Sequence, residues 1–202
     1  MQVTLEKNIP LDGPPAATWA VLQDIEEVTE CLPGAEITER VDDSHYKGQV
    51  KVKVGPASST FKGEVEVLGL DAGQHELHLH GKGQDTKGTS SATMDLKATV
   101  RDTGDGKSEV AGVSEVSVTG KMASFGGRMM EQVADQIMQQ FARNLNDRVA
   151  ARGEGAEAEA AAERVASQPR ELNALQLAWS MVVSFFRRLF GHKGSHHGEH
   201  QA

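Results

Sequence analysis

The chain has little cysteine, few aromatic residues and no surplus of positive charge, and each shortage excludes a class of protein. Its 202 residues include one cysteine, Cys31, which excludes a disulfide framework and a cysteine-based zinc site. Lysine and arginine number 21 against 29 aspartate and glutamate residues, so the formal net charge is −8 and we expect no nucleic-acid partner. The N-terminus MQVTLEKNIP has no basic segment followed by an apolar run, which predicts a cytoplasmic protein without a secretory signal.

Residues 2–122 have the pattern of a β-rich domain. Even spacing of apolar residues predicts a strand over Gln2–Pro10, and proline after Asp12-Gly13 predicts the first of two short helices, the second ending at Cys31–Gly34. From Ala35 to Met122 apolar and polar residues alternate between turn signals, which predicts about six antiparallel strands in a meander. One sheet face is apolar and rich in glycine and alanine, so we expect it to curve and to leave space above it.

After Met122 the apolar period changes to that of a helix. From Ser124 to about Arg152 an apolar residue recurs every three or four positions, which predicts a long helix lying over the curved sheet. Residues 153–170 are rich in alanine and glutamate and show no apolar face, so we predict a flexible spacer there and a domain boundary at residue 152. Residues 192–202 are predicted to be a disordered, histidine-rich end.

The segment WSMVVSFFRRLFG, residues 179–191, holds four of the nine aromatic residues of the chain. An amphipathic helix over residues 171–191 accounts for them, because its apolar-rich stretch is about 20 Å long, too short for the roughly 30 Å of a bilayer core. Such a helix lies in the membrane interface, with basic residues attracted to anionic lipids. The residues predicted to bind the membrane are Leu172, Leu175, Trp179, Val182, Val183, Phe186, Arg187, Arg188, Leu189 and Phe190.

Two alternatives for this segment are open. It could fold back onto its own domain as a core helix, against which the solvated spacer argues. It could also be a short spanning anchor, against which the polar strip along the helix argues. The interfacial helix is the preferred interpretation and predicts a peripheral protein on the inner face of the cell membrane.

Several motifs resemble those of the CoxG family, the G-type subunits of carbon monoxide dehydrogenase. They are WAVLQD at 19–24, ECLPGAE at 30–36, YKGQVKVKVGPASSTFKGEVEV at 46–67 and GKMASFGGRMMEQVADQIMQQFARNL at 120–145. The resemblance covers about the first 150 residues and implies an α+β helix-grip fold of the START/Bet v 1-like (SRPBCC) superfamily, with a curved antiparallel sheet around a long C-terminal helix. It further implies a cavity for apolar ligands and a molybdenum hydroxylase of the carbon monoxide dehydrogenase type as the partner.

The preferred hypothesis is that residues 1–152 bind an apolar molecule and the tail binds the membrane. The ligand would be a respiratory quinone such as menaquinone, which would couple the dehydrogenase to the membrane electron-transport chain. No covalent cofactor is expected. The residues predicted to line the cavity are Trp19, Phe61, Val65, Leu77, Leu79, Met94, Leu96, Val116, Val118, Met130, Ile137 and Phe141, with Phe125 and Met129 near its mouth.

Other functions find less support in the residues. A structural adaptor would tether the dehydrogenase with its interior filled by side chains. A cyclase-type enzyme would need polar residues inside, and the inward positions provide few beyond Ser114 and Tyr46, so we predict no catalytic residues. His78 and His80 share a strand face opposite Leu77 and Leu79, which indicates a solvated pair rather than a metal site, and no metal site is predicted.

Overall fold

The structure is a computed structural model that describes residues 1–54, 57–153 and 156–168. Seven strands form one antiparallel sheet in the order β1-β7-β6-β5-β4-β3-β2. The strands are β1 (Gln2–Leu11), β2 (Ala35–Arg40), β3 (His45–Val54), β4 (Ala57–Asp71), β5 (Glu76–Asp85), β6 (Ser90–Gly104) and β7 (Lys107–Gly120). The helices are α1 (Pro15–Leu22), α2 (Ile25–Cys31), the 3-10 helix η1 (Lys121–Phe125), α3 (Gly127–Ala151) and α4 (Ala156–Ser167).

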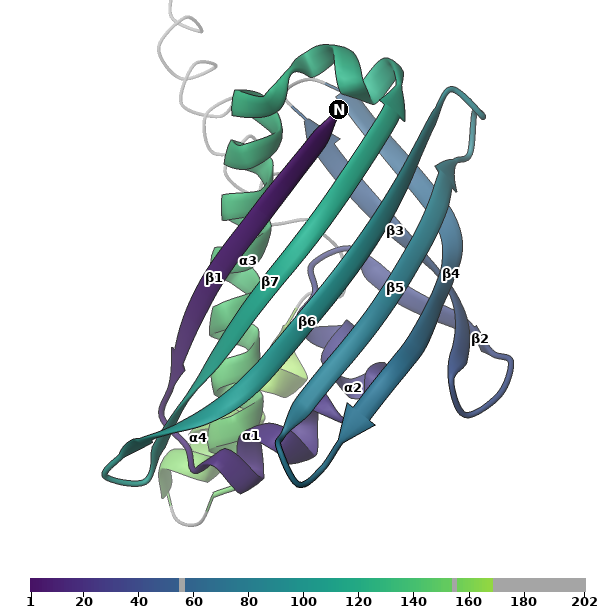
Figure 1. Ribbon diagram of the computed structural model, residues 1–202. Helices are drawn as coiled ribbons and strands as arrows, with labels where there is room; N and C mark the ends of the chain where they lie inside the picture. The colour runs from purple at the N-terminus through teal and green to yellow at the C-terminus, as the bar shows by residue number, and fades with distance from the viewer. Residues whose placement is uncertain (55–56, 154–155, 169–202) are drawn as a thin grey trace, which may run out of the picture. The chain divides into compact units, whose positions relative to one another are not determined.

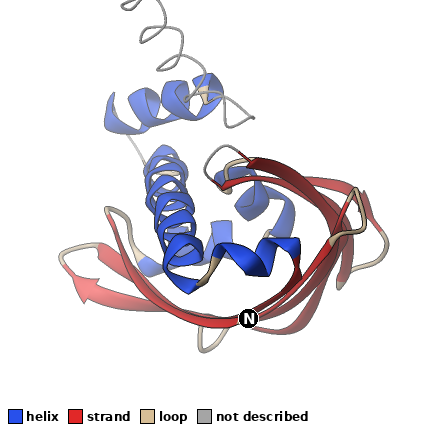
Figure 2. Cartoon of the chain, turned by 90° about the horizontal axis from the view of Figure 1, so that it is seen from above, coloured by secondary structure: helices blue, strands red, loops and turns tan. Residues whose placement is uncertain are grey.

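The sheet curves around α3, as Figure 2 shows from above. Strands β2 to β7 follow one another as a meander, and β1 closes the order by pairing with β7. Helices α1 and α2 lie at one end of α3, and η1 leads into its other end (Figure 1). The predicted fold, a curved antiparallel sheet around a long C-terminal helix, is therefore confirmed.

The two sheet faces are those that the alternation predicts. One inner row crosses the sheet as Leu5, Ser114, Leu96, Leu79 and Val67, and the next row toward η1 is Val3, Val116, Met94, Gly81 and Val65. A third inner row, toward α1, includes Gly112, Ala98 and Leu77. Charged residues such as Lys97 and Glu115 occupy the outer face, as strand alternation requires.

Local signals explain the two short helices. Helix α1 begins with a proline at its first position, and Asp24 caps α2 by accepting a hydrogen bond from the Glu27 amide at 3.0 Å. A buried chain of hydroxyl groups ties α1 to β7: Thr18 Oγ1 lies 2.8 Å from Ser108 Oγ, which donates to the Gly13 carbonyl at 2.8 Å. Since every member of this chain has a partner, it fixes α1 without the cost of an unsatisfied buried group.

The second half of α3 is held by polar contacts as well as by packing. Asn144 Nδ2 donates to the Cys31 carbonyl at 2.9 Å, and the Arg148 and Arg152 guanidinium groups pair with Glu30 and Glu27 of α2. In the first half, the ion pair of Lys7 with Asp135 at 2.8 Å joins α3 to β1, with both side chains exposed. An exposed pair of this kind stabilises by about 0–1 kcal/mol, so the first half of α3 is the more weakly held.

Residues 153–170 differ from the expected flexible spacer. Helix α4 occupies residues 156–167 and packs on α3, with Ala158 and Ala161 buried and with Arg164 Nε 2.7 Å from Asp147 Oδ1. The compact unit accordingly extends to Arg170 rather than ending at residue 152. Alanines three residues apart form a narrow stripe on which another helix packs closely, and this stripe lacks the large apolar residues that mark a packing face in a sequence.

The predicted membrane-binding helix and the histidine-rich end lie outside the described residues. Among the helices of the described part, none has the length and apolar content to cross a membrane. Because α4 packs on α3, the argument that a solvated spacer keeps the tail off its own domain does not apply to residues 156–167.

Candidate functional site

The interior between α3 and the sheet has two different ends. Toward α1 and α2, the α3 residues Phe141, Leu145 and Val149 are buried, with 9%, 0% and 1% exposure. Toward η1, Met130, Val133 and Ile137 belong to the same apolar stripe, yet each is only partly buried. The α1 end is therefore filled by side chains, whereas the η1 end leaves apolar surface uncovered.

The sheet shows the same division. The inner residues Val50, Val52, Met94 and Val116, which lie in the half of the sheet toward η1, are all partly buried. Farther toward α1, Leu77, Ala98, Val100 and Val110 are buried. Two apolar surfaces of opposite elements, both incompletely covered, face each other at the η1 end and form the candidate functional site.

The structure divides the predicted lining residues between these ends. A core cluster at the α1 end includes Trp19, Leu77, Leu79 and Phe141, with Val65 and Leu96 packed against it. A second cluster at the η1 end includes Phe61 and Val118, with Val116 and Met130 packed against it. Met94 and Ile137 are partly buried, whereas Phe125 and Met129 are 37% and 38% exposed, as expected of residues near a mouth.

The inner glycines serve two different purposes. A Cβ atom at Gly63 would lie 2.0 Å from the Lys82 carbonyl oxygen, so this glycine permits a close backbone approach where the sheet bends. At Gly81 the nearest atom would be Met94 Cε at 3.6 Å, and at Gly112 it would be Leu96 Cδ1 at 3.9 Å. The expectation of open space above the inner glycines therefore holds at Gly81 and Gly112 but is wrong at Gly63.

Among the described residues, three buried side-chain polar atoms have no hydrogen-bond partner: Trp19 Nε1, Ser114 Oγ and Arg148 Nε. Arg148 nevertheless forms ion pairs through its other nitrogens, with Glu27 and Glu30. Trp19 and Ser114 are 5% and 9% exposed, and Ser114 lies in the inner row between Leu5 and Leu96. Buried polar groups are normally paired, so the indole N–H of Trp19 and the hydroxyl of Ser114 are available to a bound molecule.

Asp85 is an ionisable residue of the inner face that the sequence pattern does not identify. It continues the inner alternation of β5 and is 6% exposed. Its carboxylate accepts hydrogen bonds from Thr89 Oγ1 at 2.7 Å, the Thr89 amide at 2.6 Å and the Ser90 amide at 3.2 Å. The hydroxyl of Thr89 is the main cause that lowers the pKa of Asp85, so the carboxylate is ionised and engaged in the β5–β6 turn.

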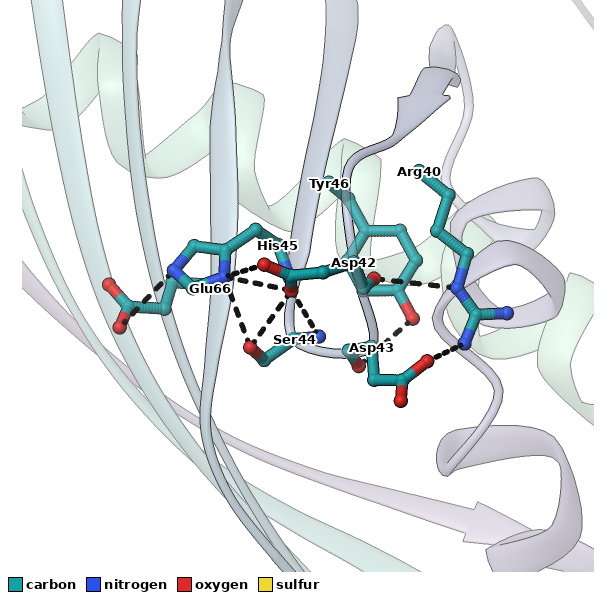
Figure 3. A network of polar contacts seen from close by, with 7 residues as sticks. All are labelled: Arg40, Asp42, Asp43, Ser44, His45, Tyr46 and Glu66. Carbon is teal, nitrogen blue, oxygen red and sulfur yellow. Dashed lines mark hydrogen bonds and ion pairs between the residues drawn. The ribbon is translucent and has the colours of Figure 1, made fainter.

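The outer face carries a row of alternating histidine and acidic side chains. His45, Glu66, His80, Asp95 and Glu115 pair in succession across β3 to β7. In the β2–β3 turn, His45 Nδ1 lies 2.9 Å from Asp42 Oδ1, and its Nε2 lies 3.7 Å from Glu66 Oε1 (Figure 3). The hydrogen bond to Asp42 raises the pKa of His45, so this outer surface titrates near neutral pH.

His78 and His80 lie where the alternation predicts, on the outer face. His78 Nε2 is 3.0 Å from Asp95 Oδ1, and His80 Nδ1 is 3.7 Å from Asp95 Oδ2. The hydrogen bond from His78 is the main cause that lowers the pKa of Asp95. In the part of the chain that the structure describes, no group of three or more histidine, cysteine or acidic residues has the arrangement of a metal site.

A shallow hollow of about 360 Å³ lies away from the interior. Its wall includes Gly69, His78, Lys97 and Thr99 of β4 to β6. His78 and Lys97 are register partners on the outer face, so the hollow opens on that face and is distinct from the candidate site. Its polar lining does not suit an apolar ligand.

The curved sheet that grips a long C-terminal helix defines a START/Bet v 1-like (SRPBCC) protein, and solved structures of this class have the same fold. A conserved protein from Geobacillus kaustophilus is similar with a TM-score of 0.66 at 19% identity, over 73% of this chain and 95% of that one. The chain belongs to the CoxG family, the G-type subunits of carbon monoxide dehydrogenase, whose family model matches residues 9–150. The resemblance of the sequence motifs is thereby confirmed, and the family name associates its members with carbon monoxide dehydrogenase.

Other structures of the same fold bear different names. The ZhuI aromatase/cyclase of Streptomyces sp. R1128 has a TM-score of 0.55 at 14% identity and covers 76% of this chain and 100% of its own. A START superfamily protein of Mycobacterium smegmatis has a TM-score of 0.51 at 15% identity and covers 72% and 96%. No curated protein sequence matches this chain. At these identities the similarity shows the fold alone.

Proposed function

We propose that this protein binds an apolar molecule such as a respiratory quinone between the first half of α3 and the sheet. The observation that supports this function is the pair of partly buried apolar surfaces at the η1 end, on α3 and on the inner sheet face. Covering apolar surface contributes about 25 cal/mol per Å², so a molecule inserted between them would be stabilised by both. The second half of α3 is filled and anchored, which provides a rigid floor for the ligand.

The same proposal includes a partner and a membrane. The family name supports a molybdenum hydroxylase of the carbon monoxide dehydrogenase type as the partner. The amphipathic sequence of residues 171–191 supports attachment to the inner face of the cell membrane, where apolar electron carriers are dissolved. In this proposal the protein takes its ligand from the membrane and couples the dehydrogenase to the electron-transport chain.

We propose a carrier rather than an enzyme. The described inner face has one buried carboxylate, Asp85, and three hydrogen bonds from Thr89 and Ser90 occupy it. A general acid or base needs a proton-accepting atom that can reach the substrate and a pKa near the working pH, whereas the pKa of Asp85 is lowered. The name of the Streptomyces aromatase/cyclase therefore applies to that protein and does not extend to this chain.

The proposal is tested by native mass spectrometry and organic extraction of the full-length protein from a host that makes quinones. We expect an isoprenoid quinone or another apolar molecule at close to one per chain. Ile137→Lys places a charge on the partly buried stripe of α3 and should abolish this ligand, because a buried ammonium is costly. Gln139→Lys, on the same helix but outside the apolar stripe, is the matched control and should retain it.

The alternative is an adaptor that tethers the dehydrogenase without a ligand. In that case extraction from the wild-type protein yields no apolar molecule above the background of a purified control, although the protein still binds its partner enzyme. That result would rule out the carrier.

A further inference from the structure

Ser114 has a side chain that packing alone does not explain. It lies at the centre of the sheet, and its neighbours in the row are Leu5 on β1 and Leu96 on β6. Along β7 the other inner positions include Val110, Val116 and Val118, and valine suits such a position better than serine does. The hydroxyl group is buried and has no partner, so it lowers the stability of the ligand-free fold.

The surroundings of Ser114 place it at the boundary between the filled end and the open end. Leu79, in the same row, is buried, whereas Val116 and Met94, in the next row toward η1, are partly buried. Gly112 and Gly81, in the two adjacent rows, have no side chains and only ordinary contacts around their Cα positions. A molecule inserted from the η1 end would therefore meet Ser114 at the deepest point it can reach.

Trp19 has the same unmet requirement at the filled end. Its indole ring is buried and stacks on His75 with the ring centroids 5.4 Å apart, while Nε1 has no acceptor. An indole nitrogen can only donate a hydrogen bond, and a serine hydroxyl can donate one. Both groups thus call for an acceptor oxygen in an otherwise apolar molecule.

We propose that Ser114 donates a hydrogen bond to a carbonyl oxygen of the bound molecule and so selects apolar ligands that carry a ketone-type or quinone-type carbonyl at one end. This inference rests on the proposed function and specifies its ligand class. The carbonyl end lies at the floor of the site, and the apolar remainder extends between Met94 and Met130 toward η1. Ser114 is a specificity-determining residue, and no chemical step is required of it.

The test uses the full-length protein and prodan, an apolar fluorophore with one ketone group, beside its carbonyl-free propyl analogue. Ser114→Ala should weaken prodan binding by about 3- to 10-fold, the effect of one neutral hydrogen bond, and leave the affinity for the analogue unchanged. Ser114→Thr keeps the hydroxyl and should restore prodan binding. Ser117→Ala removes a hydroxyl from the outer face of the same strand and is the matched control.

Two further readouts separate ligand contact from a structural role. The infrared carbonyl stretch of prodan should lie lower in the wild-type complex than in the Ser114→Ala complex, because a hydrogen bond weakens the C=O bond. Without ligand, Ser114→Ala should unfold at the same or a higher temperature than the wild type, since it removes an unpaired buried hydroxyl. If Ser114→Ala failed to fold, the Ser114→Thr protein and the infrared shift in the wild type would still decide the matter.

The outcomes distinguish this inference from the proposed function. Equal prodan affinity and an equal carbonyl stretch in the wild-type and Ser114→Ala proteins would overturn the role of Ser114 and leave apolar binding intact. Failure of the wild-type protein to bind both prodan and its analogue would overturn the proposed function as well.

Discussion

At the residue scale, Cys31 shows how burial controls chemistry. The side chain is fully buried at the end of α2, and this burial raises the pKa of its thiol to about 12. Only the thiolate reacts with disulfide reagents, and an unperturbed thiol has a pKa of about 8.5. The lone cysteine is therefore a core residue, and its position beside the α2–α3 ion pairs gives it no exposed reactive form.

We predict that the Cys31 thiol of the native protein reacts with a chromogenic disulfide reagent at pH 8 about a thousand-fold more slowly than that of the unfolded chain. The measurement compares labelling rates in buffer and in denaturing urea, and one thiol should be released in urea. Since the neutral thiol is the form that the fold favours, this contribution to stability is fully present below about pH 8.5 and falls as the pH rises further. Rapid labelling under native conditions would show that α2 opens from α3.

At the element scale, the curvature of the sheet depends on close backbone contact between β4 and β5. The row Gly48, Gly63 and Gly83 crosses three adjacent strands, and the space at Gly63 is occupied by the Lys82 carbonyl. A side chain there would push the two strands apart. By contrast, the space at Gly81, one inner position along β5 from Gly83, is limited only by the flexible end of Met94.

Gly63→Ala should accordingly destabilise the protein by about 1–3 kcal/mol, the usual cost of forcing a group into an occupied volume. Gly81→Ala is the matched control and should change the free energy of unfolding by about 0.5 kcal/mol or less, as for substitutions without a steric conflict. Urea unfolding monitored by circular dichroism measures both. Equal effects of the two variants would show that the sheet relaxes at Gly63 without loss.

The elements could be predicted from the sequence where their residues form a regular pattern. The alternation of β5 places Leu77 and Leu79 inside and His78 outside, and the apolar stripe of the long helix ends in Val149 as expected. The predicted helix start at Ser124 becomes a 3-10 turn, because Gly126 has a φ of 78° and interrupts the α-helix. Local patterns of this kind need no knowledge of which elements meet.

What could not be predicted depends on contacts between distant segments. The packing of α4 relies on two alanines and on an ion pair between Arg164 and Asp147, and neither residue type marks an interface by itself. The same holds for Ser114: its inward position follows from alternation, whereas the absence of a partner for its hydroxyl emerges only when Leu5 and Leu96 are placed beside it. The lining residues remain predictions as ligand contacts, although the structure divides them between a filled and an open end.

At the scale of the whole molecule, the chain combines a compact unit, Met1–Arg170, with the amphipathic sequence that follows it. We predict that a chain ending at Gln168 keeps the stability of the full-length protein, because every described element is retained. A chain ending at Arg152 loses the burial of Ala158 and Ala161 and the Arg164–Asp147 pair. Its free energy of unfolding should fall by about 1–2 kcal/mol.

The same truncation separates membrane attachment from folding. Full-length protein should float with vesicles of phosphatidylethanolamine and phosphatidylglycerol, and added salt should weaken the flotation because Arg187 and Arg188 contribute by charge. The chain ending at Gln168 should not float. The full-length variant Phe186→Asp should also fail, since it places a charge on the apolar face, whereas Asn173→Asp on the polar face should float like the wild type. Flotation of the Gln168 chain at the wild-type level would place the membrane-binding surface in the compact unit and remove the tail from the proposed route of the ligand.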